Sequence, residues 1–168
     1  VNHSVSADAE QKAQQWAKFF IEEMPNLNQL IATGRPDPIQ LERVTSAAKI
    51  GDVFRFKLFD RQGHLTLVSD EVAYASEGAT AREQSDKAAQ VLKTGNSNVS
   101  LKDGIGKKNR PPLYVEAFVP IVDGHGGVRG VVEIYIDQTQ MASLLKSSFA
   151  KLSMGLAFFA ALTFGFPM

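Results

Sequence analysis

The stretch LYVEAFVPIVDGHGGVRGVVEIYI, residues 113–136, decides the fold class of this chain. Apolar side chains recur at every second position in residues 113–122 and again in residues 128–136, and a two-residue period is typical of strands. The DGHGG between them, residues 123–127, is rich in residues that tight turns favour. The stretch therefore predicts a β-hairpin, the building unit of an antiparallel sheet.

A second hairpin is predicted upstream. VFRFKLF, residues 53–59, alternates in the same way, and the DRQG that follows has the Asp-first, Gly-last pattern of a tight turn. Residues 64–68 form the partner strand. The alternation places Phe54, Phe56 and Leu58 on one face, which we expect to pack against a long N-terminal helix.

That helix is predicted over residues 8–33, where apolar side chains recur at three- and four-residue spacing. Pro25 predicts a kink or a restart, because proline cannot donate to the helix ladder. Asp37 precedes a proline and stands three residues before Gln40, which is a capping box with proline at the first helical position. It predicts a second helix, over residues 38–48.

Two more capping boxes predict two more helices. Thr80 with Glu83 opens a helix that ends near Gly95, and Asp137 with Gln140 opens a last helix after the second hairpin.

The elements combine into one α+β domain. Hairpin-paired strands with helices gathered at the ends are typical of a domain built on an antiparallel sheet. Residues 99–102 supply the remaining strand, and a chain of 168 residues suits a single domain. We expect a five-stranded antiparallel sheet with a long N-terminal helix and a C-terminal helix.

The composition excludes several classes of function. The 18 Lys and Arg balance 18 Asp and Glu, whereas a nucleic-acid binder needs a basic excess to neutralise phosphates. The absence of cysteine excludes disulfides, thiol nucleophiles and Cys-ligated zinc. The three histidines stand far apart, and the nucleophile-elbow and phosphate-loop motifs are missing. We expect no enzymatic activity, no metal and no cofactor.

The C-terminal run LSMGLAFFAALTFGF, residues 152–166, carries no charge. A helix that crosses a bilayer needs ~20 apolar residues. We expect residues 1–151 to form the domain and residues 152–168 to begin a transmembrane helix, in a chain that is a segment of a longer protein. The alternative is an apolar helix buried in the domain, which the lack of any polar face disfavours.

One face of the predicted sheet collects polar side chains: Arg55, Lys57, Tyr114, Glu116 and Tyr135. The plain interpretation is a solvated face with a cross-strand salt bridge. The functional interpretation is a pocket for a small polar molecule, an organic acid or an amino acid, with residues 70–112 folded over it as a lid. Glu116 is expected either to pair with Arg55 in the empty pocket or to bind the amine of an amino-acid ligand.

The N-terminal helix carries more apolar surface than one stripe needs. Phe19 and Ile21 flank Phe20, so apolar side chains spread around the helix. This surplus predicts a homodimer seam in addition to a core-facing side.

Three segments together resemble a known family: FDRQG at 59–63, PLYVEAFVPI at 112–121 and GVVEIYIDQT at 130–139. With the helical start and the helical excursion between the hairpins, nearly the whole chain resembles the PAS-like extracytoplasmic sensor domains of bacteria, called PDC or Cache domains. In that family the final hairpin is followed by the helix that enters the membrane.

The resemblance implies a sensor in the bacterial inner membrane that faces the periplasm, with a cytoplasmic output domain elsewhere in the parent protein. The parent would be a diguanylate cyclase, a cyclic-di-GMP phosphodiesterase or a two-component histidine kinase. The amine-binding signature of some double Cache domains is missing, so the resemblance implies no particular ligand. The rival interpretation is a ligand-free dimerisation module of a membrane protein.

Overall fold

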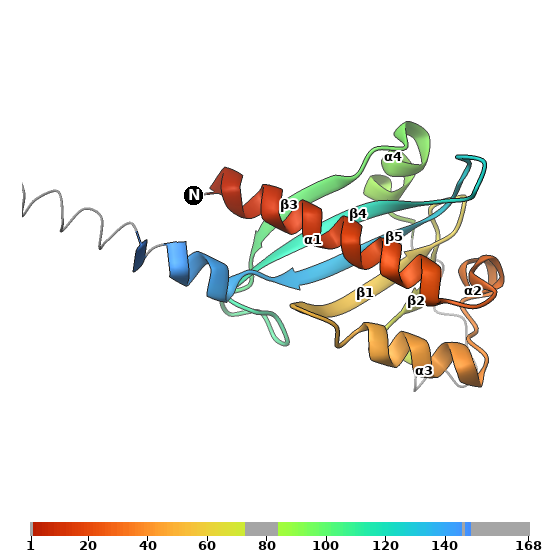
Figure 1. Cartoon of the computed structure of the whole chain (residues 1–168), viewed down its shortest axis with the longest axis horizontal. Coiled ribbons are helices and arrows are strands. Elements are labelled where there is room, and N and C mark those ends of the chain that lie inside the picture. The colour runs from red at the N-terminus through yellow and green to blue at the C-terminus, as the bar shows by residue number, and fades with distance from the viewer. Residues whose placement is uncertain (1, 73–83, 146, 149–168) are drawn as a thin grey trace, which may run out of the picture.

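The computed structural model describes residues 2–72, 84–145 and 147–148. A long helix, α1 (Asn2–Glu23), lies along one face of an antiparallel sheet (Figure 1). The predicted capping box at residues 80–83 and the apolar tail at residues 152–168 lie outside the described residues.

The predicted break at Pro25 is confirmed. Helix α1 ends just before it, and a short helix, α2 (Leu27–Thr33), begins just after it. Asn26 joins the two in the left-handed backbone region, with φ of 49°. Asparagine is one of the few residues that tolerate this conformation, which lets the chain change direction between the two helices.

The capping box of helix α3 (Pro38–Ala47) is also confirmed. The Asp37 side chain accepts a hydrogen bond from the Gln40 backbone N–H at 2.8 Å, and the Gln40 side chain accepts one from the Asp37 N–H at 3.0 Å. Gln40 is fully buried, and its Nε2 donates to the Pro25 carbonyl at 2.7 Å. One residue therefore caps α3 and ties it to the end of α1.

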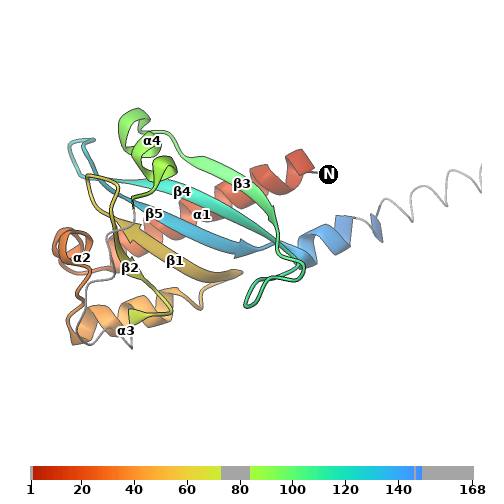
Figure 2. The same cartoon turned by 180° about the vertical axis from the view of Figure 1, so that it is seen from behind.

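The sheet has the spatial order β2-β1-β5-β4-β3, with every neighbouring pair antiparallel. This confirms the α+β class and the five-stranded sheet, and the order is consistent with a PAS-like fold. Figure 2 shows the sheet from the side opposite α1. The strands are β1 (Val53–Phe59), β2 (Leu65–Val68), β3 (Asn98–Asp103), β4 (Leu113–Val122) and β5 (Val128–Asp137).

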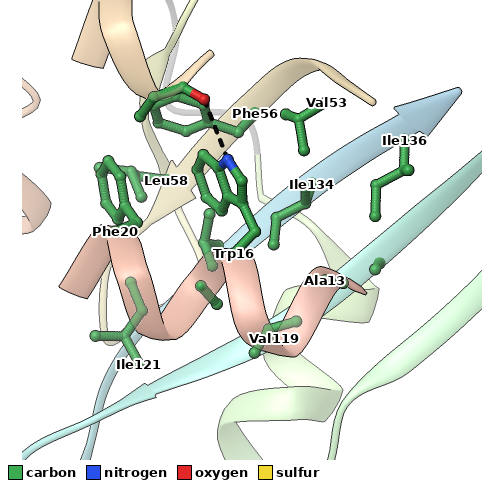
Figure 3. Close-up of a cluster of buried hydrophobic side chains, with 14 of the residues drawn as sticks. Ala13, Trp16, Phe20, Val53, Phe56, Leu58, Val119, Ile121, Ile134 and Ile136 are labelled. Atoms are coloured by element: carbon green, nitrogen blue, oxygen red, sulfur yellow. Dashed lines mark hydrogen bonds between the residues drawn. The ribbon is translucent and has the colours of Figure 1, made fainter. Parts of the chain in front are cut away.

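The main core lies between α1 and the sheet (Figure 3). The Trp16 ring stacks on Phe20 at 5.2 Å between centroids, and both meet Phe56 of β1 at 5.0 Å. Trp16 Nε1 donates to the Ala47 carbonyl of α3 at 3.1 Å, so the buried indole N–H is satisfied. Burial of these large rings fixes α1 and α3 against β1.

The predicted position of Phe54 is wrong. Phe56 and Leu58 face α1 as expected, but Phe54 contacts Tyr114 and Tyr135 on the opposite side of the sheet. The pairing of β1 with β5 shifts register between Val53 and Arg55. Such an irregularity interrupts the simple alternation of side chains, which the sequence pattern alone assumed.

Helix α4 (Asp86–Thr94) begins later than the sequence predicted. Gln84 forms a β-bridge with His64, so the backbone there is extended rather than helical. Ser85 is the N-cap, and its hydroxyl accepts from the Ala88 N–H at 3.3 Å. The end at Gly95, in the left-handed region with φ of 68°, is as predicted.

After β5 the chain turns into a helix over residues 139–145, and the Asp137 side chain accepts from the Thr139 N–H at 2.8 Å. This helix and the start of α1 lie at the same end of the domain in both views (Figures 1 and 2). Within the described ranges, no helix is long and apolar enough to cross a membrane.

Candidate functional site

The candidate site is the sheet face away from α1, which we call the outer face (Figure 2). All five residues that the sequence singled out lie on it. Arg55 stands opposite Tyr135 across the β1–β5 pair, and Tyr135 stands opposite Glu116 across the β5–β4 pair. Lys57 and Tyr114 lie two residues along from Arg55 and Glu116, on the same side of their strands. That these residues bind a ligand stays a prediction.

Both cations on β1 are paired with carboxylates. Arg55 Nε lies 3.0 Å from Asp70 Oδ1, and its Nη2 lies 3.1 Å from Glu71 Oε1. Lys57 Nζ lies 3.5 Å from Glu133 Oε2. The two positive charges that suggested an anionic ligand are therefore balanced by the protein's own acids.

The expected pair of Arg55 with Glu116 is wrong. Glu116 lies between two lysines instead, 3.5 Å from Lys102 Nζ and 3.7 Å from Lys87 Nζ. Strand β5 separates β1 from β4, so the two backbones are two strand spacings, about 10 Å, apart. The sequence pattern shows which face a residue occupies but does not show which strand lies next to it.

Glu133 also belongs to this face, although it was not among the predicted site residues. It is only 4% exposed, although it lies on the outer face beside Tyr135. Burial raises the pKa of Glu133 above its usual value, against the opposing pull of the Lys57 ammonium. The sequence contains the signal for this residue. Glu133 is an acid in an apolar strand and stands two residues from Tyr135, so the two side chains share one face of the sheet.

Three aromatic rings meet at the end of the outer face where β5 ends. Phe54 approaches Tyr114 and Tyr135 edge-on, each at 5.9 Å between centroids, and the two tyrosines stack at 6.2 Å. Burial and the nearby negative charge of Glu133 raise the pKa of Tyr135, so its phenol is neutral at physiological pH. We call these three rings the aromatic cluster.

Two cations lie over the aromatic cluster: Lys57 Nζ is 5.6 Å from the Tyr135 ring centroid, and Arg110 contacts all three rings. Arg110, from the loop between β3 and β4, places its guanidinium carbon 4.6 Å from the Tyr135 ring centroid, 5.6 Å from that of Tyr114 and 5.8 Å from that of Phe54. These distances are within the range of favourable cation–π contacts. This loop belongs to residues 70–112, which were expected to form a lid over the pocket, but Arg110 was not among the predicted site residues.

Helix α4 covers the opposite end of the outer face. Its Ala88 and Val91 pack with Phe59, Phe118 and Val131 in a second, smaller apolar cluster. The outer face is therefore divided into an apolar end under α4, a charged middle and an aromatic end.

The aromatic end adjoins the junction between β5 and the helix at residues 139–145. The Gln138 N–H donates to the Leu113 carbonyl at 2.9 Å, which ties the junction to the start of β4. The Gln138 side chain is fully buried, and neither its Nε2 nor its Oε1 has a hydrogen-bond partner within the described residues. A buried amide that lacks a partner is costly, which makes Gln138 a residue to test by substitution.

Hollows among the described residues lie elsewhere on the domain. One of about 800 Å³ lies between α2 and the turn from β4 to β5, and its lining includes Leu27, Asp123 and Arg129. Another, of about 450 Å³, lies beside Asp60 and also borders Arg129. The five predicted site residues line neither of these hollows.

Among the described residues, no group of three or more His, Cys, Asp or Glu side chains is arranged to hold a metal ion. His64 lies beside Asp60, with Nδ1 3.4 Å from Oδ2.

Comparisons with known proteins find similarity among solved structures. No protein-family profile and no curated protein matches the chain. Among solved structures, an extracellular ligand binding receptor from Desulfohalobium retbaense is similar over 79% of this chain and 24% of that chain, with 13% sequence identity and a TM-score of 0.39. The chain thus spans about a quarter of that receptor's length.

Proposed function

We propose that this chain is a PAS-like sensor domain of the PDC or Cache type, which binds a small polar ligand on its outer face and has no catalytic activity. The observation that carries the proposal is the position of the charged and aromatic residues. They lie on the sheet face away from the main core, and Tyr135 stands three residues before the buried Gln138 at the start of the C-terminal helix.

A sensor needs an element with two states, and the junction after β5 has the properties of one. Among the described residues the buried Gln138 amide has no hydrogen-bond partner, and an arrangement that gives it one would be favoured. A ligand that moves the Tyr135 side chain would also act on the end of β5, which leads into this junction. The helix at residues 139–145 would then carry the change out of the domain.

The membrane context rests on the resemblance and on the apolar tail. We propose that residues 152–168 begin a transmembrane helix, that the domain faces the bacterial periplasm, and that the parent carries a cyclic-di-GMP enzyme or histidine kinase output. The start of α1 and the helix at residues 139–145 lie at one end of the domain, as a receptor whose two ends lead to one membrane requires (Figure 1).

Truncation after residue 151 tests the membrane role: it should abolish vesicle binding and leave thermal stability unchanged, whereas a loss of domain stability would place the tail in the core.

The test of ligand sensing is a thermal-shift screen of organic acids, amino acids and small amines on the full chain. The screen is repeated on Arg55→Ala, which removes a guanidinium from the charged middle of the outer face. Arg43→Ala is the matched control, because Arg43 also pairs with a glutamate, Glu23, but lies on α3. A compound that stabilises wild type and Arg43→Ala but not Arg55→Ala places the site at Arg55, whereas hits that stabilise all three equally overturn the proposed site.

The second candidate is a ligand-free dimerisation module. The favouring observation is Phe19 on α1, which is 40% exposed. Sedimentation over a wide concentration range tests it, with Phe19→Ser as the variant. A dimer that Phe19→Ser abolishes, together with an empty ligand screen, would replace the sensor proposal with this one.

A further inference from the structure

The aromatic cluster and Arg110 have the geometry of an occupied cation site. Phe54, Tyr114 and Tyr135 come from three different strands, and all three ring centroids lie within 5.8 Å of the Arg110 guanidinium carbon. Most cation–π contacts involve one ring, whereas a cation surrounded by several rings is the arrangement with which proteins recognise quaternary ammonium groups.

The position of the Arg110 guanidinium over the rings depends on the contacts of its side chain. A guanidinium carries five N–H donors, yet the contacts of Arg110 among the described residues are those with the three rings. Every other cation of the outer face has a carboxylate partner: Arg55, Lys57, Lys87 and Lys102. The rings are therefore the main attraction that keeps Arg110 in place.

The backbone beneath Arg110 is fixed. The Gly104 N–H donates to the Pro112 carbonyl at 3.1 Å, which closes the neck of the loop. A Cβ at position 104 would lie 2.0 Å from the Pro111 carbonyl oxygen, so the two strands of the neck are in close contact. Arg110 immediately precedes this neck. Its guanidinium can leave the rings by rotation about side-chain bonds, with no rearrangement of the loop.

We propose that the aromatic cluster is a binding site for an organic cation, a quaternary or protonated amine, and that Arg110 occupies it until the ligand displaces it. The inference rests on the proposed sensor function and narrows its ligand class. The charge balance is in accord with this ligand class, because Arg55 and Lys57 are already paired with acids, which disfavours an anionic ligand at β1. Movement of the Tyr135 ring would act on the junction at Gln138.

The test measures choline binding by calorimetry on the full chain as wild type and as Arg110→Ala. The neutral isostere 3,3-dimethylbutan-1-ol is the ligand control, and Arg43→Ala is the variant control. Removal of the competing guanidinium should tighten choline binding by between about 2-fold and about 30-fold, the equivalent of one exposed to well-desolvated cation–π contact. The affinity for the neutral isostere should not change between wild type and Arg110→Ala, because this molecule has the shape of choline but no charge. Phe54→Leu, at a half-buried ring, should weaken choline binding in the Arg110→Ala background.

Two results would overturn the inference. One is an absence of choline binding to Arg110→Ala at millimolar concentration while the variant remains folded by circular dichroism. The other is an equal increase in affinity for choline and for its neutral isostere in Arg110→Ala. That result would show that the site selects an apolar shape and not a positive charge.

The same experiment separates this inference from the proposed function. If an organic acid binds through Arg55 while choline does not bind, the sensor proposal stands and the cation site fails. If choline binds but hydrogen exchange at residues 138–145 does not change, the site stands and the signalling role fails.

Discussion

Replacement of Lys57 by methionine should destabilise the domain in a pH-dependent way. The variant keeps the length of the side chain but leaves the Glu133 carboxylate, with 6% of its side chain exposed, without its ammonium partner at 3.5 Å. Removal of one partner from a fully buried pair costs roughly 3–5 kcal/mol. The Lys57 side chain is 21% exposed, and Glu133 can relieve its own charge by taking up a proton, so we expect about 2 kcal/mol at neutral pH.

The sign of the pH dependence follows from Glu133. Because burial raises the pKa of Glu133 in the folded protein, the folded state keeps this proton to a higher pH than the unfolded chain does. Stability therefore falls as the pH rises through the folded-state pKa. Loss of Lys57 raises that pKa further. The difference in unfolding free energy between wild type and Lys57→Met should widen as the pH rises above the usual glutamate value of 4.5 and narrow towards it.

Urea unfolding at several values between about pH 5 and about pH 8 measures this difference. Lys18→Met is the matched control, because Lys18 pairs with Glu22 at 3.9 Å on the exposed side of α1 and should contribute little. The double variant Lys57→Met with Glu133→Gln should recover most of the lost stability. A difference that stays constant across the pH range, or a double variant no more stable than Lys57→Met, would refute the buried-charge reasoning.

Three further substitutions test the fold and the junction. Gly34→Ala should lower the free energy of unfolding in urea by well over ~1 kcal/mol. Gly34 has φ of 62°, and a Cβ there would lie 1.8 Å from the Thr66 carbonyl oxygen. Gly95→Ala is the milder comparison, because there is open space around Gly95. Trp16→Phe should cost roughly 1–3 kcal/mol by far-ultraviolet circular dichroism, since it removes part of a buried ring and leaves the Ala47 carbonyl with only the Ile50 N–H at 3.2 Å; an unchanged midpoint would contradict that role. Gln138→Met should stabilise the domain by about 1 kcal/mol or more, since it removes a buried amide that has no partner among the described residues; a loss of stability would show that the amide is satisfied.

Local signals in the sequence determined most of the secondary structure. The capping box of Asp37 and Gln40, the break at Pro25 and the stop at Gly95 each depend on hydrogen bonds or backbone angles within a few residues. Such signals are readable without knowledge of the fold. The start of α4 was misplaced because its competitor, the bridge between His64 and Gln84, is a contact between distant residues.

The sequence alone determined the side of the sheet for the five predicted site residues, although not for Phe54. Strict alternation put Arg55, Lys57, Tyr114, Glu116 and Tyr135 on one face, because side chains along a strand point alternately to opposite sides. Only the tertiary structure decided which strands are neighbours. The insertion of β5 between β1 and β4 pairs Lys57 with Glu133, keeps Glu116 away from Arg55, and with the irregularity at Phe54 assembles the aromatic cluster under Arg110. Strand neighbours are chosen by the packing of the whole core, a sum over contacts between residues far apart in the chain, which no local pattern contains.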